Sequence, residues 1–268
     1  MSVEFFDKTI VAKSFGKAAE HYDSVAHFQR WVGGELLKKI PNSSVQSDKF
    51  NILDLGCGTG YFSPALLNHS PSGSYFGLDL SVDMVKFARQ SHSYERCTWL
   101  TGDAESIPLK TNSVDLVYSS LSIQWCGDLG SMFEEVTRVL RDDGVFVFSS
   151  LLEGSLSELK ASWSAVDSMQ HVNAFSKLDD YQAAIQESGL QVVALDVEQK
   201  VLKYKKVKEL TKELKTLGAH NMTSHRSTAL TGKQKIKGFL SAYECFRLED
   251  GTLPATYQVL WGVLRKSL

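Results

Sequence analysis

The chain has 268 residues, of which 43% are hydrophobic and 22% charged, and its formal net charge is -2 at pH 7. This composition is typical of a globular protein with a sizeable core, and the slightly acidic balance argues against a protein that binds nucleic acid. Apolar runs are only strand-sized, and the N-terminus carries acids, so neither a membrane span nor a signal peptide is predicted. The 4 cysteines are scattered and form no CxxC pair, so we expect a reducing, cytoplasmic environment.

Apolar residues recur every three or four positions over residues 11–37, which predicts a helical N-terminal segment. Gly33-Gly34 and Pro41 interrupt this pattern, and the polar stretch 42–49 predicts a surface loop. We expect residues 1–45 to form a helical lid over the rest of the chain. Simple docking of the helix on the domain is the alternative.

Between residues 50 and 149, strand-like runs alternate with helical patterns. The strand-like runs are 50–55, 75–80, 98–100, 114–119 and 145–149. The helical patterns between them are 61–68, 82–90 and 132–140. Strands that alternate with helices build βαβ units, whose right-handed crossovers give a parallel sheet covered on both faces.

After residue 150 the pattern becomes mainly helical. Helices are expected at 155–167, 178–187, 207–217 and 233–246, and strands at 190–197 and 255–264. We therefore expect one doubly wound α/β domain, with a mostly parallel seven-stranded sheet and helical insertions after the fifth strand. Residues 46–150 would form its ligand-binding core, and residues 151–268 would bind the second substrate.

Three glycines, Gly56, Gly58 and Gly60, follow a strand that ends in Asp54-Leu55. Glycine lets the backbone turn sharply and approach a ligand closely, and ligands bind such sheets at the carboxyl ends of the strands. The dinucleotide fingerprint needs glycine or alanine where Tyr61 stands, which makes a nicotinamide enzyme the least favoured interpretation. The GxGxG spacing alone is also compatible with any tight turn.

Two further carboxylates follow the next two strands. Asp79, with Leu80 after it, ends the second strand, and its carboxylate can accept hydrogen bonds from both hydroxyls of a ribose. A helix N-cap is the alternative for Asp79, although Ser81 can fill that role. Asp103 follows the third strand and could accept from an adenine amino group, while the Ala104 backbone N–H donates to the ring. The alternative for Asp103 is a turn-former.

The order DLGCGTG, LDLS, GDAESIPL and DLVYSSLSIQWC is similar to that of class I S-adenosylmethionine-dependent methyltransferases. Other segments resemble the malonyl-acyl-carrier-protein O-methyltransferases of biotin synthesis: FGKAAEHYD (15–23), SLSIQWCGDL (120–129), GSLSELKASWSAVD (154–167), HVNAF (171–175), LKTLGAHNMTSHRSTALTGKQ (214–234) and LPATYQVLWGVLRK (253–266). The late segments carry this narrower assignment. The resemblance implies a class I methyltransferase fold, S-adenosyl-L-methionine as cofactor, and methylation of the free carboxylate of malonyl-acyl-carrier protein or malonyl-CoA.

The resemblance also implies roles for particular residues. It places Tyr22, on the lid, near the sulfonium of the cofactor. Leu121 and Gln124 are expected to border the methyl group, and Trp125 is either core or pocket wall. Because a carboxylate is already ionised at neutral pH, no general base is expected.

A buried malonyl carboxylate needs a cation or several hydrogen-bond donors. Arg226 is the candidate, since its planar fork suits a carboxylate, and His171 and Asn173 could add donors from a second loop. The alternatives are a surface role for Arg226 and a helix-capping role for His171. No two histidines have metal-ligand spacing, so no metal is expected.

Lysines gather at 203–208 and 233–237, either as solvated helix faces or as a docking patch for the acidic carrier protein. We expect a monomer. Two other functions stay open at this point: methylation of another small acid or a quinone, and a non-catalytic S-adenosylmethionine-binding module.

Overall fold

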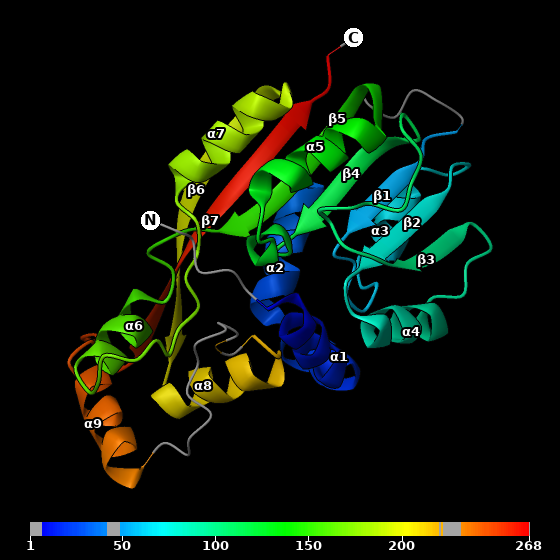
Figure 1. Ribbon diagram of the computed structural model, residues 1–268. Coiled ribbons are helices and arrows are strands. Elements are labelled where there is room, and N and C mark those ends of the chain that lie inside the picture. Colours follow the sequence, from blue (N-terminus) through cyan, green and yellow to red (C-terminus); the bar gives the residue numbers. More distant parts are fainter. Residues whose placement is uncertain (1–6, 42–48, 220, 222–231, 268) are drawn as a thin grey trace.

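A computed structural model describes residues 7–41, 49–219, 221 and 232–267 as one sheet flanked by helices (Figure 1). The helices are α1 (Lys8–Val25), α2 (His27–Leu37), α3 (Ser63–Asn68), α4 (Val82–Ser91), η2 (Ile123–Trp125, a 3-10 turn), α5 (Leu129–Val139), α6 (Ser157–Ser164), α7 (Leu178–Ser188), α8 (Val207–Thr216) and α9 (Lys233–Glu244). The strands are β1 (Ile52–Leu55), β2 (Tyr75–Asp79), β3 (Cys97–Thr101), β4 (Val114–Ser120), β5 (Leu140–Leu151), β6 (Gln191–Tyr204) and β7 (Leu253–Arg265).

The strands form a seven-stranded sheet in the order β3-β2-β1-β4-β5-β7-β6. Strands β1 to β5 pair in parallel, whereas β7 runs antiparallel to both β5 and β6. Because β1 lies between β2 and β4, the chain winds outward from it in both directions. The predicted doubly wound, mostly parallel sheet is confirmed.

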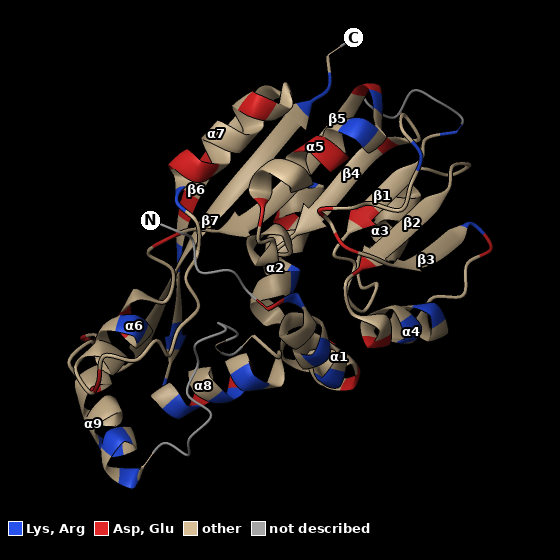
Figure 2. Cartoon of the chain, viewed as in Figure 1, with Lys and Arg blue, Asp and Glu red and all other residues tan. Residues whose placement is uncertain are grey.

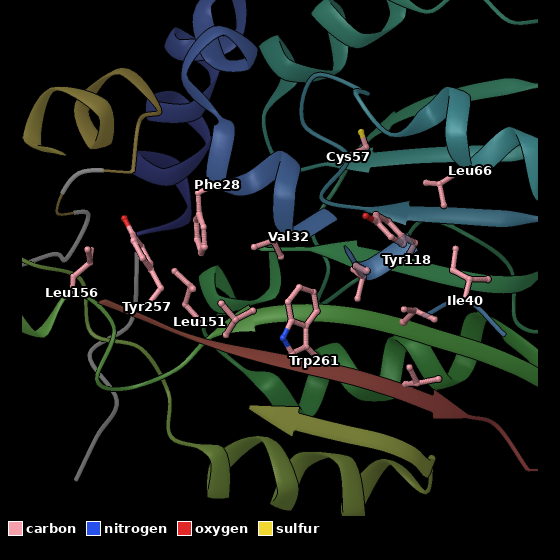
Figure 3. Packing of buried hydrophobic residues seen from close by; sticks show 14 of the residues in the cluster. Phe28, Val32, Ile40, Cys57, Leu66, Tyr118, Leu151, Leu156, Tyr257 and Trp261 are labelled. Atoms are coloured by element: carbon pink, nitrogen blue, oxygen red, sulfur yellow. The ribbon is translucent and has the colours of Figure 1, made fainter. Parts of the chain in front are cut away.

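Two apolar cores lie on opposite faces of the sheet, because successive side chains of a strand point to opposite faces. On β5, Val145 and Val147 belong to one core, and Phe146 and Phe148 belong to the other. Helices α5 and α7 cover the phenylalanine side, and α2, α3 and α4 cover the valine side. Figure 3 shows the valine-side core, where α2 lies above the β7 residue Trp261.

Strand β6 is longer than its sequence pattern predicts, since it extends to Tyr204 and not only to residue 197. The added segment EQKVLKY is charged and mostly exposed, so apolar alternation does not reveal it. Backbone pairing with β7 continues along it to the Tyr204–Leu253 pair, and an edge strand tolerates charged side chains. The antiparallel β6–β7 pair thus extends beyond the rest of the sheet, with α6, α8 and α9 near its far end (Figure 1).

The N-terminal segment forms two helices, α1 and α2, that meet at Ala26. Gly33 and Gly34 lie inside α2, so the predicted interruption at this pair is wrong. Gly33 is suited to this place because the Phe62 ring occupies the space that a Cβ would need. The Gly33 carbonyl also accepts a hydrogen bond from the Tyr118 hydroxyl.

The two N-terminal helices are packed differently. Helix α2 contributes Phe28, Val32 and Leu36 to the valine-side core, whereas none of the described residues of α1 belongs to either core. Helix α1 instead packs across α4 and α8. Gly16 permits the contact with α4, since a Cβ there would lie 2.8 Å from the Ser81 Oγ. Helix α1 therefore buries its apolar residues Val11, Ala18 and Ala19 outside these two cores, whereas α2 contributes to the valine-side core.

Candidate active site

A pocket, here called the central pocket, lies where the carboxyl ends of β1, β2 and β4 meet. The strand order reverses at this edge, which is the usual ligand site of open α/β sheets. Helix α1 forms one of its walls with Lys8, Val11, Phe15 and Tyr22.

The glycine loop between β1 and α3 forms another wall. Gly56 and Gly58 line the central pocket, with φ angles of +77° and +53° that disfavour other residues. Around Gly58, a Cβ would meet no heavy atom within 4 Å, so a side chain there would extend into open space at the pocket. Gly60 lies behind the loop instead, where a Cβ would be 2.7 Å from the Trp99 ring. Close packing against the protein itself therefore explains why this position is a glycine.

Asp79 lies at the end of β2 and anchors the loop. Its Oδ2 accepts a hydrogen bond from the Gly58 N–H at 2.9 Å, and its Oδ1 accepts from the Ser81 N–H at 2.8 Å. Burial raises the pKa of Asp79, and these two donors partly offset the shift. The N-cap of α4 is Ser81, whose Oγ accepts from the Met84 N–H. Asp79 and Leu80 line the central pocket, and contact of Asp79 with a ribose stays a prediction.

Asp103 and Ala104 line the other end of the central pocket. The Asp103 Oδ1 accepts from the Glu105 N–H at 3.0 Å, so the turn-forming role is present. Its Oδ2 lies 2.7 Å from the Lys8 Nζ, which also lies 2.6 Å from the Glu105 carboxylate. Lys8 belongs to α1, so this pair of ionic contacts fastens the helix across the pocket. Contact of Asp103 with an adenine stays a prediction.

A second pocket, the side pocket, adjoins the central one and shares Tyr22, Gly56 and Gly58 with it. It is lined by Asp54 and by Arg30 of α2. Burial raises the pKa of Asp54 to about 7, and the negative charge of Asp79 raises it as well. A 2.7 Å hydrogen bond from the Tyr75 hydroxyl acts in the opposite direction and lowers this pKa. The side pocket therefore offers a titratable acid and a cation to one ligand.

A third pocket, the apolar pocket, lies on the other side of Tyr22. It shares Phe15, Tyr22, Leu121 and Trp125 with the central pocket. Its remaining described lining is Phe28, Gln29, Gln124, Leu151, Leu156, Asn173, Phe175, Leu214, Leu217, Ala219 and Tyr257. None of these described residues is charged, so the apolar pocket suits an uncharged chain or a group bound by neutral donors.

Tyr22 lines all three pockets. Burial raises the pKa of its hydroxyl above the ordinary range, and the nearby carboxylates of Asp79 and Asp23 raise it further. The phenol is therefore neutral at any physiological pH and can donate a hydrogen bond. It cannot serve as a base.

The segment after β4 forms the boundary between the central and apolar pockets. Leu121 has a φ of +48°, which is strained for a branched side chain, and its N–H donates to the Ser149 carbonyl. Gln124 lines only the apolar pocket; its amide donates to the Leu121 carbonyl at 2.7 Å, which braces this turn. Trp125 lines both pockets and packs edge-on against Phe15, with ring centroids 5.5 Å apart. It is a pocket wall.

The residues proposed to bind the acceptor are not assembled together in the described structure. His171 stacks on Trp163, with ring centroids 3.9 Å apart, and its Nε2 lies 2.7 Å from the Asp167 carboxylate. Asn173 lines the apolar pocket and donates to the Ala219 carbonyl at 3.3 Å. Arg226 lies outside the described residues. The roles of His171 and Arg226 stay predictions.

The polar pocket residues that sequence reasoning missed include Lys8, Gln29 and Arg30. All three belong to the N-terminal helices, where the only signal in the sequence is apolar periodicity. A polar residue on a helix flanking an apolar face is ordinarily solvated. Only the packing of α1 and α2 against the sheet turns these residues toward a pocket.

Within the described residues, no helix is long and apolar enough to span a membrane. The same part of the chain contains no group of three or more His, Cys, Asp or Glu side chains that could hold a metal ion.

Comparison with known proteins adds an independent line of evidence. Residues 53–148 match a family described as a methyltransferase domain. The chain is 42% identical over 260 residues to the biotin biosynthesis bifunctional protein BioHC of Cellvibrio japonicus, covering 97% of this chain and 50% of that protein. It is 35% identical to the malonyl-acyl-carrier-protein O-methyltransferase of Gallionella capsiferriformans, covering 96% and 90% of the two chains. The chain thus spans about half the length of the bifunctional relatives it matches.

The fold has close structural counterparts as well. The crystal structure of the YcgJ protein from Bacillus subtilis superimposes with a TM-score of 0.60, covering 89% of this chain and 99% of that one. At 19% sequence identity, this likeness shows a shared fold alone.

Proposed function

This chain belongs to the malonyl-acyl-carrier-protein O-methyltransferase family, as its late sequence segments predicted, and we propose that it methylates the free carboxylate of a malonyl thioester. The methyl donor is S-adenosyl-L-methionine, and the product is the malonyl methyl ester that enters biotin synthesis. The observation that carries this proposal is the meeting of the central and apolar pockets at Tyr22, Leu121 and Trp125. Such a junction lets a donor and an acceptor approach one another from opposite sides.

The residues of the central and side pockets fit the cofactor. Gly58 leaves room for a ligand next to the loop. Asp79 is proposed to bind the ribose and Asp103 with Ala104 the adenine, because all three line the central pocket. In the side pocket, Asp54 and Arg30 match the amino and carboxylate groups of an amino acid in charge. When bound, S-adenosyl-L-methionine supplies a methyl group on a positively charged sulfur, which leaves as a neutral thioether.

The transfer needs alignment and the exclusion of water more than it needs a base. A malonyl carboxylate oxygen forms a bond to the methyl carbon while the carbon–sulfur bond breaks, and the electron pair of that bond stays on sulfur. No proton moves, which agrees with a neutral Tyr22 at the junction. Helix α1 holds Phe15 and Tyr22 over the junction, and the fixed geometry supplies orientation.

The acceptor is proposed to enter through the apolar pocket. Its thioester arm can lie along the uncharged lining, and acyl-carrier protein and coenzyme A present the same arm. Arg226 remains the proposed cation for the carboxylate, with His171 and Asn173 as further donors. We also propose that the chain works as a monomer in the cytoplasm; its four free cysteines favour a reducing compartment.

The proposal is tested with S-adenosyl-L-methionine labelled in the methyl group. We expect label to enter malonyl-acyl-carrier protein and to be released by mild base as methanol, because a methyl ester is base-labile. The same assay with malonyl-CoA measures the contribution of the carrier protein. Cofactor binding in calorimetry without transfer to any malonyl thioester would contradict the proposed activity and favour a binding module.

A further inference from the structure

Gln29, in the first turn of α2, has a buried polar atom without a partner. Its side-chain carbonyl oxygen is shielded from solvent, and no donor among the described residues reaches it. Gln29 lines both the side pocket and the apolar pocket, as Tyr22 does. Because an unpaired buried amide costs folding free energy, its position between two pockets indicates a ligand group that pairs with it.

The other amides of the apolar pocket are already engaged. Gln124 donates to the Leu121 carbonyl, and its own oxygen accepts from the Ser150 hydroxyl. Asn173 donates to the Ala219 carbonyl. None of the described lining residues is charged. An acid that enters this pocket therefore meets the Gln29 amide and the hydroxyls of Tyr22 and Tyr257, which hold no other described residue by a side-chain hydrogen bond.

We propose that the Gln29 side-chain amide binds one oxygen of the malonyl carboxylate and directs the other oxygen at the methyl group. This inference rests on the proposed function and adds a substrate-binding residue to it. A carboxylate only accepts hydrogen bonds, so the amide must present its NH2 group. Rotation of the amide by 180° exchanges its oxygen and nitrogen, which structures seldom distinguish. The Tyr22 hydroxyl is a second neutral donor at the same junction.

A neutral donor can orient the carboxylate alongside the cation proposed for it, without adding a second positive charge at the attacking oxygen. A guanidinium that grips both oxygens would lower the nucleophilicity of the carboxylate, whereas an amide fixes its orientation and leaves most of its negative charge on the attacking oxygen. The apolar walls exclude water, which strengthens the amide–carboxylate hydrogen bond. Gln29 thereby selects an acceptor that carries a carboxylate at the junction.

The competing role for Gln29 is contact with the amino group of the cofactor, because it also faces the side pocket. Asp54 and Arg30 are proposed to match an amino acid there, and Asp23 is a further carboxylate in the same pocket. The two roles differ in what a substitution changes. An acceptor contact affects transfer at saturating cofactor, whereas a cofactor contact affects cofactor affinity.

The first test replaces Gln29 by leucine, which keeps the bulk and removes the donor. We expect kcat/KM for malonyl-acyl-carrier protein to fall about tenfold to a hundredfold, as for loss of a hydrogen bond to a charged group. The cofactor dissociation constant should stay within about twofold. Gln182→Leu, at an exposed position of α7, is the matched control. Normal kcat/KM in Gln29→Leu, or a loss confined to cofactor affinity, overturns the inference.

The second test is Gln29→Glu, measured from about pH 8 to about pH 6 at saturating cofactor. The introduced carboxylate repels the malonyl carboxylate, but burial favours its protonated form, which can donate a hydrogen bond. The activity ratio of variant to wild type should therefore rise as pH falls. The ratio is used because wild type and variant share the other charged or titratable residues that line the two pockets around Gln29. These are Tyr22, Asp23, Arg30, Asp54, Cys57, Tyr61, Tyr118 and Tyr257.

A pH-independent ratio overturns the inference, because a carboxylate that faces the malonyl group must repel it in the charged form and not in the protonated form. Failure of the proposed function is a separate outcome. If the proposed function is wrong, the wild-type protein itself transfers no methyl group to malonyl thioesters. If only the inference about Gln29 is wrong, the wild-type protein transfers the methyl group and the Gln29 variants are as active as wild type.

Discussion

At the scale of single residues, the site consists of carboxylates held in different environments. Asp79 has two backbone donors, which favour its charged form, whereas Asp54 is more deeply buried and accepts a hydrogen bond from the Tyr75 hydroxyl. Burial raises the pKa of both, but for Asp54 the value is raised to about 7. Asp54 is therefore the carboxylate whose charge changes near neutral pH, and its titration is coupled to any cation bound beside it.

We expect cofactor affinity to weaken as pH falls from about 7.5 to about 5.5, by about tenfold or more. The sign follows from the raised pKa: below about 7 free Asp54 is protonated, while a bound ammonium favours the carboxylate, so binding at low pH must release a proton. Above about pH 8 the ligand amine itself loses its charge. Calorimetry with S-adenosylhomocysteine measures the effect. The Asp54→Asn variant should bind S-adenosylhomocysteine weakly and with little pH dependence. The control is Asp196→Asn, at an exposed position of β6, which should behave like wild type. Equal slopes in wild type and Asp54→Asn would refute this role.

At the scale of elements, α1 is the part of the protein that closes the site without belonging to the core. Lys8 bridges to Asp103 and Glu105 across the central pocket, and the Asp23 carboxylate accepts a hydrogen bond from the Thr59 hydroxyl of the glycine loop. These contacts hold both ends of the helix against the ligand-binding edge. We therefore propose a lid that ends at Val25, since α2 packs into the domain, and the division at residue 45 stays a prediction.

Removal of residues 1–25 should leave a folded domain but reduce methyl transfer about a hundredfold or more, because water then reaches the junction and Tyr22 is lost. By contrast, a longer deletion, of residues 1–31, should unfold the domain. It removes Phe28, which stacks on Tyr257 with ring centroids 4.4 Å apart. Thermal melts followed by circular dichroism distinguish the two deletions. Transfer at the full rate by the shorter one would show that α1 is not a lid.

At the scale of the whole molecule, positive charge gathers on the helices beyond the sheet. Figure 2 shows lysines along α8 and α9, on the same side of the molecule as α1. Lys205, Lys206 and Lys208 are exposed, whereas Lys203 pairs with Asp250 at 2.6 Å. The solvated-face interpretation and a docking patch for an acidic carrier protein both agree with these exposures. They differ in their consequences for kinetics.

If the patch docks the carrier protein, reversal of Lys205, Lys206 and Lys208 to Glu should raise KM for malonyl-acyl-carrier protein about tenfold at low salt. The effect should shrink at high salt, and KM for malonyl-CoA should hardly change, because coenzyme A carries the arm without the protein. Reversal of Lys86, Lys110 and Lys177, outside the patch, is a charge-matched control. Equal losses on both acceptors would indicate a structural role or a shared phosphate contact.

The periodicity and order of the sequence determined the fold class and the wall of the central pocket. Alternating strands and helices imply a parallel sheet, and in such a sheet the carboxyl ends of the strands lie at one edge. Gly58, Asp79 and Asp103 could therefore be placed beside one another from sequence, although 45 residues separate the first from the last. Their convergence follows from the strand rule and needs no knowledge of side-chain packing.

Only the tertiary structure decided which residues complete the site from outside that edge. Lys8, Gln29 and Arg30 reach the pockets because α1 and α2 pack against elements far along the chain, and no local pattern encodes such contacts. The Phe62 ring likewise places Gly33 inside a helix, and pairing with β7 extends β6 through a charged segment. In each case, short-range propensity was overridden by a partner distant in sequence, because the free energy of packing and strand pairing exceeds the small local preferences for helix, turn or loop.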